Sequence, residues 1–113
     1  RVLVVDDEVM IGEVAEAYLL GAGFEVTLTT NGTDAIQAAL DMTFNLAVID
    51  LNMPPPGGWA VLNALRTLQP GVPVVIASGF AAAAEVAARG GAALVAKPYS
   101  RDQLISVVSE LLE

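Results

Sequence analysis

The sequence predicts an α/β fold built on an open, doubly wound parallel sheet. Short apolar runs rich in β-branched residues alternate with longer segments of helical period, and the alternation occurs five times in 113 residues. Continuous apolar runs of this length are typical of strands buried on both faces, as in a parallel sheet. A closed barrel of such units needs eight of them, so five units favour an open sheet with helices on both faces.

A strand is expected at each of the five apolar runs. In chain order, the expected strands are Val2–Val5, Phe24–Leu28, Leu46–Ile49, Val72–Ala77 and Ala93–Ala96. Ligands of open parallel sheets bind beyond the carboxyl ends of the strands. The residues that follow these runs are therefore the first candidates for a functional site.

The segment after the first strand carries apolar residues at spacings of three and four, which is typical of a helix packed along one face. These residues are Ile11, Val14, Ala15, Tyr18 and Ala22. We expect Gly21 and Gly23 to end this helix, and Asn31-Gly32-Thr33 to begin the second one.

The last three helices are expected from the same kind of pattern. Leucines mark the third helix at Leu62, Leu65 and Leu68. The fourth helix is predicted over Ala81–Arg89 and is closed by Gly90-Gly91, and Ser100 is expected to cap the fifth. The apolar stripe of the fifth helix is Leu104, Val107, Val108 and Leu111. With no linker or repeat in between, residues 1–113 are predicted to form one domain.

Composition excludes several classes of function. The chain has no cysteine and no histidine, which excludes disulfide scaffolds, the usual zinc sites, Cys or His nucleophiles and the Ser-His-Asp triad. Thirteen acidic and five basic side chains give a net charge of −8. This charge argues against direct binding to nucleic acid or to an anionic membrane.

The sequence also argues against a membrane-spanning segment. The longest stretch without a charge, Thr67–Ala84, contains Pro70, Gly71 and Pro73, whereas a spanning helix needs about 20 mostly apolar residues without such breaks. The chain begins with Arg1 and runs directly into a short apolar segment, which is unlike a secretory signal. We therefore expect a cytoplasmic protein.

Polar and charged side chains stand at the ends of four of the five predicted strands. Asp6-Asp7-Glu8 follows the first, Asp50 the third, Ser78-Gly79 the fourth and Lys97-Pro98 the fifth. Two carboxylates 4 Å apart repel by about 4 kcal/mol at an effective dielectric constant near 20, and a single lysine offsets only part of this repulsion. Oxygen ligands with access to water suit Mg²⁺, for which Mn²⁺ is an alternative. The pattern indicates a metal-assisted phosphoryl site.

Each of these residues also has an ordinary structural explanation. Asp7 would serve as the N-cap of the first helix, and Asp50 or Ser78 as a turn former. Lys97 would extend into solvent, as most lysines do, although it is the only lysine in the chain. Taken separately these explanations are adequate, but together they do not predict that all four groups fall at strand ends.

The ordered motifs resemble those of the receiver domains of two-component response regulators. The motifs are Val4-Val5-Asp6-Asp7-Glu8, Asp50-Leu51-Asn52-Met53-Pro54 with Gly58, Ser78-Gly79 and Lys97-Pro98-Tyr99. The resemblance covers the chain from Val2 to the last helix. It implies a flavodoxin-like (βα)5 three-layer sandwich with the parallel sheet order 2-1-3-4-5.

The resemblance implies a role for each site residue. Asp50 would accept a phosphoryl group from the phosphohistidine of a sensor histidine kinase or of a phosphotransfer protein. Lys97 would pair with Asp50 and then with the phosphoryl oxygens, and Ser78 would form a hydrogen bond with the phosphoryl group. The Lys97-Pro98 peptide bond would be cis, which is accessible at low cost only before proline.

The same resemblance implies the metal ligands and the output. Asp6, Asp7, Asp50 and the backbone carbonyl of Asn52 would hold Mg²⁺. The signal would be a conformational shift of the fourth helix and the fifth strand, and the fourth-helix and fifth-helix face is a candidate homodimer surface. Such a domain signals and is not an enzyme, beyond assisting its own phosphorylation and dephosphorylation.

Three positions bear on how the signal is transmitted and how long it lasts. Many receivers have an aromatic switch residue three positions before the lysine, but here that residue is Leu94. Asn52 and Phe80 fall where the family adjusts the lifetime of the phosphoryl group.

Three other functions fit these residues less well than the receiver does. An Asp-nucleophile phosphohydrolase of the haloacid dehalogenase type usually needs a second aspartate two residues after the nucleophile, where this chain has Asn52. An FMN carrier would suffer repulsion between its phosphate and Asp6-Asp7-Glu8. A receiver-like scaffold that is never phosphorylated would not need the full set of site residues.

Overall fold

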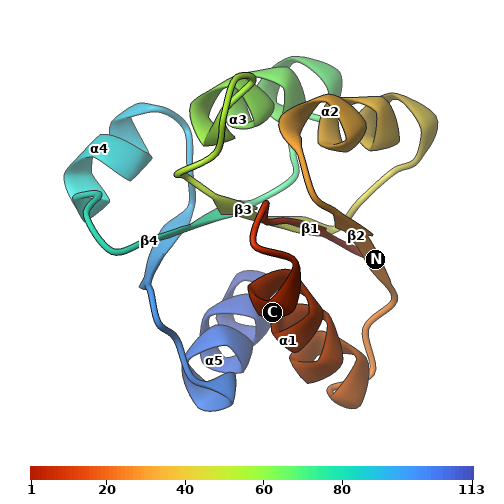
Figure 1. The fold of residues 1–113 in the computed structure, drawn as a ribbon, viewed down its shortest axis with the longest axis vertical. Coiled ribbons are helices and arrows are strands. Elements are labelled where there is room, and N and C mark those ends of the chain that lie inside the picture. The colour runs from red at the N-terminus through yellow and green to blue at the C-terminus, as the bar shows by residue number, and fades with distance from the viewer.

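The computed structural model describes residues 1–113 (Figure 1). Five strands and five helices alternate along the chain. The strands are β1 (Val2–Val5), β2 (Val26–Thr29), β3 (Leu46–Asp50), β4 (Val74–Ser78) and β5 (Ala93–Ala96). The helices are α1 (Val9–Gly21), α2 (Gly32–Asp41), α3 (Gly58–Leu68), α4 (Ala83–Ala88) and α5 (Arg101–Leu111).

The strands form one parallel sheet in the order β2-β1-β3-β4-β5, which confirms the predicted fold class. Helices α2, α3 and α4 cover one face of the sheet, and α1 and α5 cover the other (Figure 1). Side chains of β1 alternate between the two layers: Leu3 and Val5 pack under α2 and α3, whereas Val2 and Val4 pack under α1 and α5. The two layers of apolar side chains hold the carboxyl ends of the central strands at a common edge.

Three strands differ in their boundaries from the sequence-based prediction. β2 begins at Val26 rather than Phe24, because the Phe24 N–H group bonds to the Leu19 carbonyl and closes α1. β4 begins at Val74 rather than Val72, whose N–H group closes a turn onto Gln69. β2, β3 and β4 each extend one residue further than predicted, so that Thr29, Asp50 and Ser78 are the last residues of their strands.

The fourth helix is shorter than the predicted span Ala81–Arg89. It covers only Ala83–Ala88. The hydroxyl oxygen of Ser78 accepts hydrogen bonds from the N–H groups of Phe80 and Ala81, at 3.1 and 3.2 Å. This side-chain bonding competes with helical hydrogen bonding, and the helix begins only after it.

The buried face of α1 also differs from the predicted stripe. Gly12, Ala15 and Leu19 are buried, whereas Val14 is 46% exposed and Ala22 is exposed. A Cβ atom on Gly12 would lie 3.0 Å from the Leu28 side chain, so the helix approaches the sheet through its smallest residue. The hydropathy pattern of the sequence does not reveal this close approach of Gly12 to the sheet. The approach leaves Val14 facing solvent.

Two of the predicted caps are confirmed and one alternative is wrong. The Asn31 side chain accepts a hydrogen bond from the Asp34 N–H group at 2.8 Å, and Ser100 forms a reciprocal capping box with Gln103. Asp7 is not the N-cap of α1, because that position is occupied by Glu8. No helix is long and apolar enough to cross a membrane.

Candidate functional site

The polar residues predicted at the strand ends lie together at one edge of the sheet. Asp6 follows β1, Asp50 ends β3, Ser78 ends β4 and Lys97 follows β5. Because β1, β3, β4 and β5 are consecutive in the sheet, the fold brings these residues into one cluster. Asp6, Asp50 and Ser78 are each only 3% exposed, which is unusual for polar side chains.

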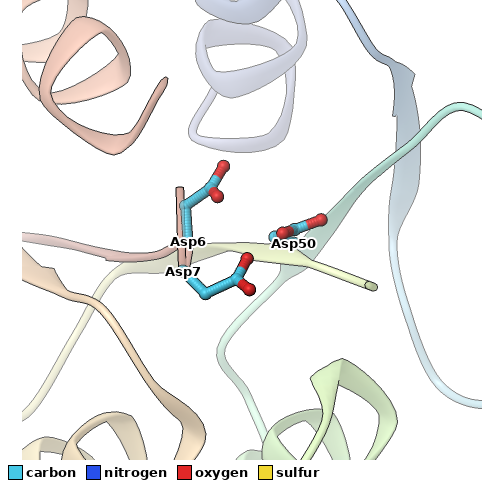
Figure 2. A group of neighbouring side chains, drawn as sticks. All are labelled: Asp6, Asp7 and Asp50. Carbon is cyan, nitrogen blue, oxygen red and sulfur yellow. The ribbon is translucent and has the colours of Figure 1, made fainter. Parts of the chain in front are cut away.

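Three carboxylates form the acidic part of the site. Asp6, Asp7 and Asp50 each contribute an oxygen, and these oxygens lie within 4.8 Å of one another (Figure 2). Asp7 is exposed, so the cluster has access to solvent on that side. Three carboxylates at this separation repel one another strongly, and a divalent cation among them would relieve the repulsion.

Lys97 supplies the one positive charge in the cluster. Its Nζ atom lies 2.9 Å from Asp6 Oδ2, 3.2 Å from Asp50 Oδ1 and 3.8 Å from Glu8 Oε1. Burial lowers the pKa of Lys97, but the hydrogen bond and charge of Asp6 and the charge of Asp50 outweigh burial and raise it. The lysine therefore stays protonated, and it lies closer to Asp6 than to the Asp50 partner predicted from the sequence.

The two oxygens of Asp50 have different surroundings. Oδ1 accepts a hydrogen bond from the Asn52 N–H group at 3.2 Å and faces Lys97, whereas Oδ2 is buried and has no hydrogen-bond partner. Burial, reinforced by the charge of Asp6, raises the pKa of Asp50 to about 6. A buried carboxylate oxygen without a partner is costly, and a cation bound at this edge would supply the missing partner.

Ser78 and Asn52 are held close to Asp50 by the local chain path. The Ser78 hydroxyl accepts hydrogen bonds from its own loop and makes none with Asp50 or Lys97. Asn52 contributes its N–H group to Asp50. Gly58 allows α3 to begin directly beside this loop, because a Cβ atom there would lie 2.5 Å from the Asp50 carbonyl oxygen. The Lys97-Pro98 peptide bond is cis, as the resemblance implies.

A hollow of about 650 Å³ opens beside the acidic cluster. Glu8, Asn52, Gly79 and Lys97 lie on its polar side. Its remaining lining is apolar and comes from Met10, Ile11, Val14, Phe80, Pro98 and Tyr99. Met10 is 80% and Phe80 91% exposed. Burial, together with the charge of Asp6, raises the pKa of Tyr99 to about 12, so this side chain remains a neutral phenol.

This apolar lining was missed by the reasoning from sequence. The available signal is the run of large apolar residues Val9-Met10-Ile11, which directly follows three acidic residues at the start of the first helix. The helical spacing places Ile11 and Val14 on the packed face of α1 instead, and it says nothing of Met10.

The chain matches the family model of the response regulator receiver domain over residues 2–109. The parallel five-stranded fold and the acidic edge agree with this match. The chain therefore belongs to the receiver domain family of two-component response regulators, which are signalling domains.

The curated relatives are longer proteins. The transcriptional regulatory protein ZraR of Klebsiella oxytoca is 31% identical over 114 residues, which span 98% of this chain and 26% of that protein. The probable transcriptional regulatory protein TcrX of Mycobacterium tuberculosis is 33% identical over 98% of this chain and 49% of its own length. The chain thus spans between a quarter and a half of these relatives.

Two solved receiver structures match over most of their length. The receiver domain of NtrX from Brucella abortus has a TM-score of 0.91 at 30% identity, covering 99% of this chain and 98% of that one. A CheY-like receiver domain protein from Methanospirillum hungatei has a TM-score of 0.93 at 26% identity, covering 99% and 92%.

Proposed function

We propose that this chain accepts a phosphoryl group on Asp50 from the phosphohistidine of a sensor kinase or of a phosphotransfer protein. The observation that carries the proposal is the Asp50 carboxylate. Its Oδ2 atom is buried without a partner, and its Oδ1 atom faces the only ammonium group of the site. These features suit an oxygen nucleophile better than a structural carboxylate.

The transfer itself asks little covalent chemistry of the protein. A carboxylate oxygen of Asp50 would attack phosphorus, the P–N bond to the donor imidazole would break, and the imidazole nitrogen would keep the electron pair and take up a proton. Such reactions are accelerated mainly by positioning and by charge complementarity. Lys97 lies 3.2 Å from Asp50 Oδ1 and is suited to follow the negative charge onto the phosphoryl oxygens.

The donor set fits Mg²⁺, or Mn²⁺ in its place. Asp6, Asp7 and Asp50 converge within 4.8 Å, Asp50 has an oxygen without a partner, and all of these donors are hard oxygens. These three residues, with the backbone carbonyl of Asn52, would hold the ion. When bound, the ion supplies positive charge next to the transferring oxygens. Asp50 would have to be ionised for both binding and attack, which a pKa of about 6 permits at neutral pH.

Ser78 would convert phosphorylation into movement. Its hydroxyl oxygen accepts two backbone hydrogen bonds, and its own hydrogen is free to be donated to a phosphoryl group. A turn of the hydroxyl toward Asp50 would release the N–H groups of Phe80 and Ala81, which lead into α4. We propose that α4 and β5 shift in consequence, although Leu94 replaces the switch aromatic.

The hollow beside the site is the proposed docking region for the phosphodonor. Exposed apolar side chains such as Met10 and Phe80 next to a buried acceptor favour a partner that covers them with an apolar surface. The chain carries a net charge of −8, so basic residues around that surface would favour association.

Three further points belong to the same proposal. Residues 1–113 act as one receiver unit in the cytoplasm. The chain turns over no external substrate, since Asn52 stands where a phosphohydrolase of the haloacid dehalogenase type usually needs its second aspartate. The homodimer through α4 and α5 remains a prediction; a hollow of about 460 Å³ between β5 and α5, lined by Leu94 and Val107 among others, lies on that side.

The proposal is tested by intact mass spectrometry after incubation with acetyl phosphate and Mg²⁺. We expect one added phosphoryl group on the wild-type chain, and none on Asp50→Asn or in the presence of EDTA. Asp41→Asn removes an acidic group far from the site and should behave as the wild type. An unmodified wild-type chain that nevertheless binds Mg²⁺ would favour a scaffold, and steady release of phosphate from a phosphomonoester would favour a hydrolase.

A further inference from the structure

Helix α4 has little apolar attachment to the rest of the protein. It is six residues long, and Val86 is its only buried residue. Val86 packs into the layer under α2 and α3, beneath the turn at Gly91, where a Cβ atom would lie 2.6 Å from the Val86 side chain. A helix held by one buried side chain needs other contacts to keep a fixed position.

The second attachment of α4 is a contact between Arg89 and Trp59. The guanidinium carbon of Arg89, the residue that ends α4, lies 4.5 Å from the centre of the Trp59 ring. Arg89 also forms an ion pair with Glu85 at 3.3 Å, which orients the guanidinium group within its own helix. Trp59 belongs to α3 and is the only tryptophan in the chain.

Trp59 lies on a part of the molecule that is fixed relative to Asp50. The preceding residue, Gly58, lies so close to the Asp50 carbonyl that a Cβ atom would be 2.5 Å from it. Trp59 also packs against the apolar layer that contains Leu62 and Leu65. The position of the indole ring is therefore fixed by packing, whereas the helix that ends at Arg89 is short and has a single buried side chain.

The other end of α4 is connected to the site through Ser78. The Ser78 hydroxyl holds the N–H groups of Phe80 and Ala81, just before the N-cap residue Ala82. One end of α4 is thus tied to the hydroxyl residue of the site and the other to Trp59. A movement of the loop at Ser78 would be transmitted along six residues to Arg89.

We propose that the Arg89–Trp59 contact is a latch that stabilises α4 in the arrangement of the unphosphorylated chain. This inference rests on the function proposed above. It assigns Trp59 of α3 a part in the conformational switch, in a chain that has Leu94 on β5 in place of the switch aromatic. After phosphorylation at Asp50, the Ser78 hydroxyl turns toward the phosphoryl group and releases the N–H groups of Phe80 and Ala81. Helix α4 then shifts, and the Arg89 guanidinium group leaves the Trp59 ring. The latch thereby sets how readily the chain changes state.

Thermodynamic linkage gives the sign and the size of the effect. A contact made in only one of two arrangements shifts the equilibrium by its own interaction energy. Exposed cation–π contacts have energies that correspond to about a two- to fivefold change in an equilibrium constant. Removal of the latch should therefore tighten the binding of a phosphoryl analogue about two- to fivefold.

The test titrates beryllofluoride in the presence of Mg²⁺ and follows the bound fluorine by NMR, which does not depend on the tryptophan. Arg89→Gln removes the cation and should bind the analogue about two- to fivefold more tightly than the wild type. Arg89→Lys keeps a cation for the ring and should restore affinity close to that of the wild type. Arg101→Gln makes the same change in charge on α5, in a surface ion pair with Asp102, and should have no effect.

Trp59→Leu and the double variant with Arg89→Gln complete the test. The two substitutions should not add, because either one alone already breaks the contact. Unfolding curves of each variant separate a shift of the switch from loss of the fold. Equal affinities of the Arg89→Gln and Arg101→Gln variants, with a wild type that binds the analogue, would overturn the latch and leave the proposed function intact. A wild type that does not bind would refute the proposed function, and the latch with it.

Discussion

The side chains of Gln69 and Asp50 lie at opposite ends of the same sheet, and they differ in how far their polar atoms are hydrogen-bonded. Gln69, near the amino end of β3, accepts a hydrogen bond from the Phe44 N–H group and donates to the carbonyls of Ala39 and Met42, at 2.7–2.9 Å. Asp50, at the carboxyl end, is more deeply buried, yet one of its oxygens has no partner. The hydrogen bonds of Gln69 stabilise the fold. The oxygen of Asp50 that has no partner lowers the stability of the fold but leaves an atom that a ligand could bind.

The largest effect on stability is expected from Gln69→Ala. The substitution leaves three backbone groups around the α2–β3 turn without their partner, so the free energy of unfolding should fall by about 2–3 kcal/mol. Urea unfolding measures this change. Gln37→Ala makes the same chemical change on an exposed helix surface and should cost less than about 0.5 kcal/mol. Equal losses for both variants would contradict a structural role for the Gln69 contacts.

Asp50→Asn should raise the free energy of unfolding at neutral to alkaline pH, whereas Gln69→Ala lowers it. The pKa of Asp50 is raised from 3.8 to about 6 in the folded chain, so the unfolded chain ionises first. The favourable contribution of this carboxyl group is fully present below about pH 4 and is lost as the pH rises through about 6. In EDTA at pH 8, the variant should therefore be more stable than the wild type by about 2–3 kcal/mol.

The same comparison at pH 4 provides the control for Asp50→Asn. The folded wild type is then almost uncharged at position 50, as the variant is, and the difference between their unfolding free energies should fall below about 1 kcal/mol. A variant that is less stable than the wild type at pH 8 would mean that Lys97 fully compensates the charge of Asp50.

Binding of Mg²⁺ should relieve the repulsion among the carboxylates of Asp6, Asp7 and Asp50, and so stabilise the fold. At ten times its dissociation constant, the ion should raise the free energy of unfolding of the wild type by about 1.4 kcal/mol. Asp7→Asn should need more Mg²⁺ for the same gain, because it removes one of the three converging carboxylates. Asp41→Asn has the same change in charge at the far end of α2 and should respond as the wild type does. Thermal unfolding over a Mg²⁺ titration measures these gains.

The smallest effect is expected from Ser100→Ala. Loss of the capping box at the start of α5 should lower the free energy of unfolding by about 1 kcal/mol. The gain on adding Mg²⁺ should be unchanged, although α5 begins only a few residues after Lys97. A weaker Mg²⁺ response in this variant would show that the acidic edge depends on the position of α5.

Where the sequence carries a local signal, its predictions agree with the structure. β1 and β5 were predicted to the residue, and the caps Asn31 and Ser100 act as expected. The edge strand β2 was placed two residues early, because its start depends on where the end of α1 takes up the Phe24 N–H group. The predicted buried face of α1 is wrong because Gly12, which has no hydropathy signal, approaches the sheet closely.

The convergence of the site residues followed from topology, whereas the geometry among them did not. Parallel strands carry their carboxyl ends to one edge, so Asp6, Asp50 and Lys97 had to lie near one another. The preference of Lys97 for Asp6 and the free oxygen of Asp50 depend on side-chain distances that spacing along the chain does not encode.

The central claim is that the Asp50 carboxylate is the phosphoryl acceptor, and chemical trapping tests it most directly. After incubation with acetyl phosphate and Mg²⁺, borohydride reduces an aspartyl phosphate to homoserine, whose position peptide mass spectrometry then determines. We predict homoserine at position 50 and unmodified aspartate at positions 6 and 7. Homoserine at position 6 or 7, or a phosphorylated chain with aspartate retained at position 50, would contradict the account.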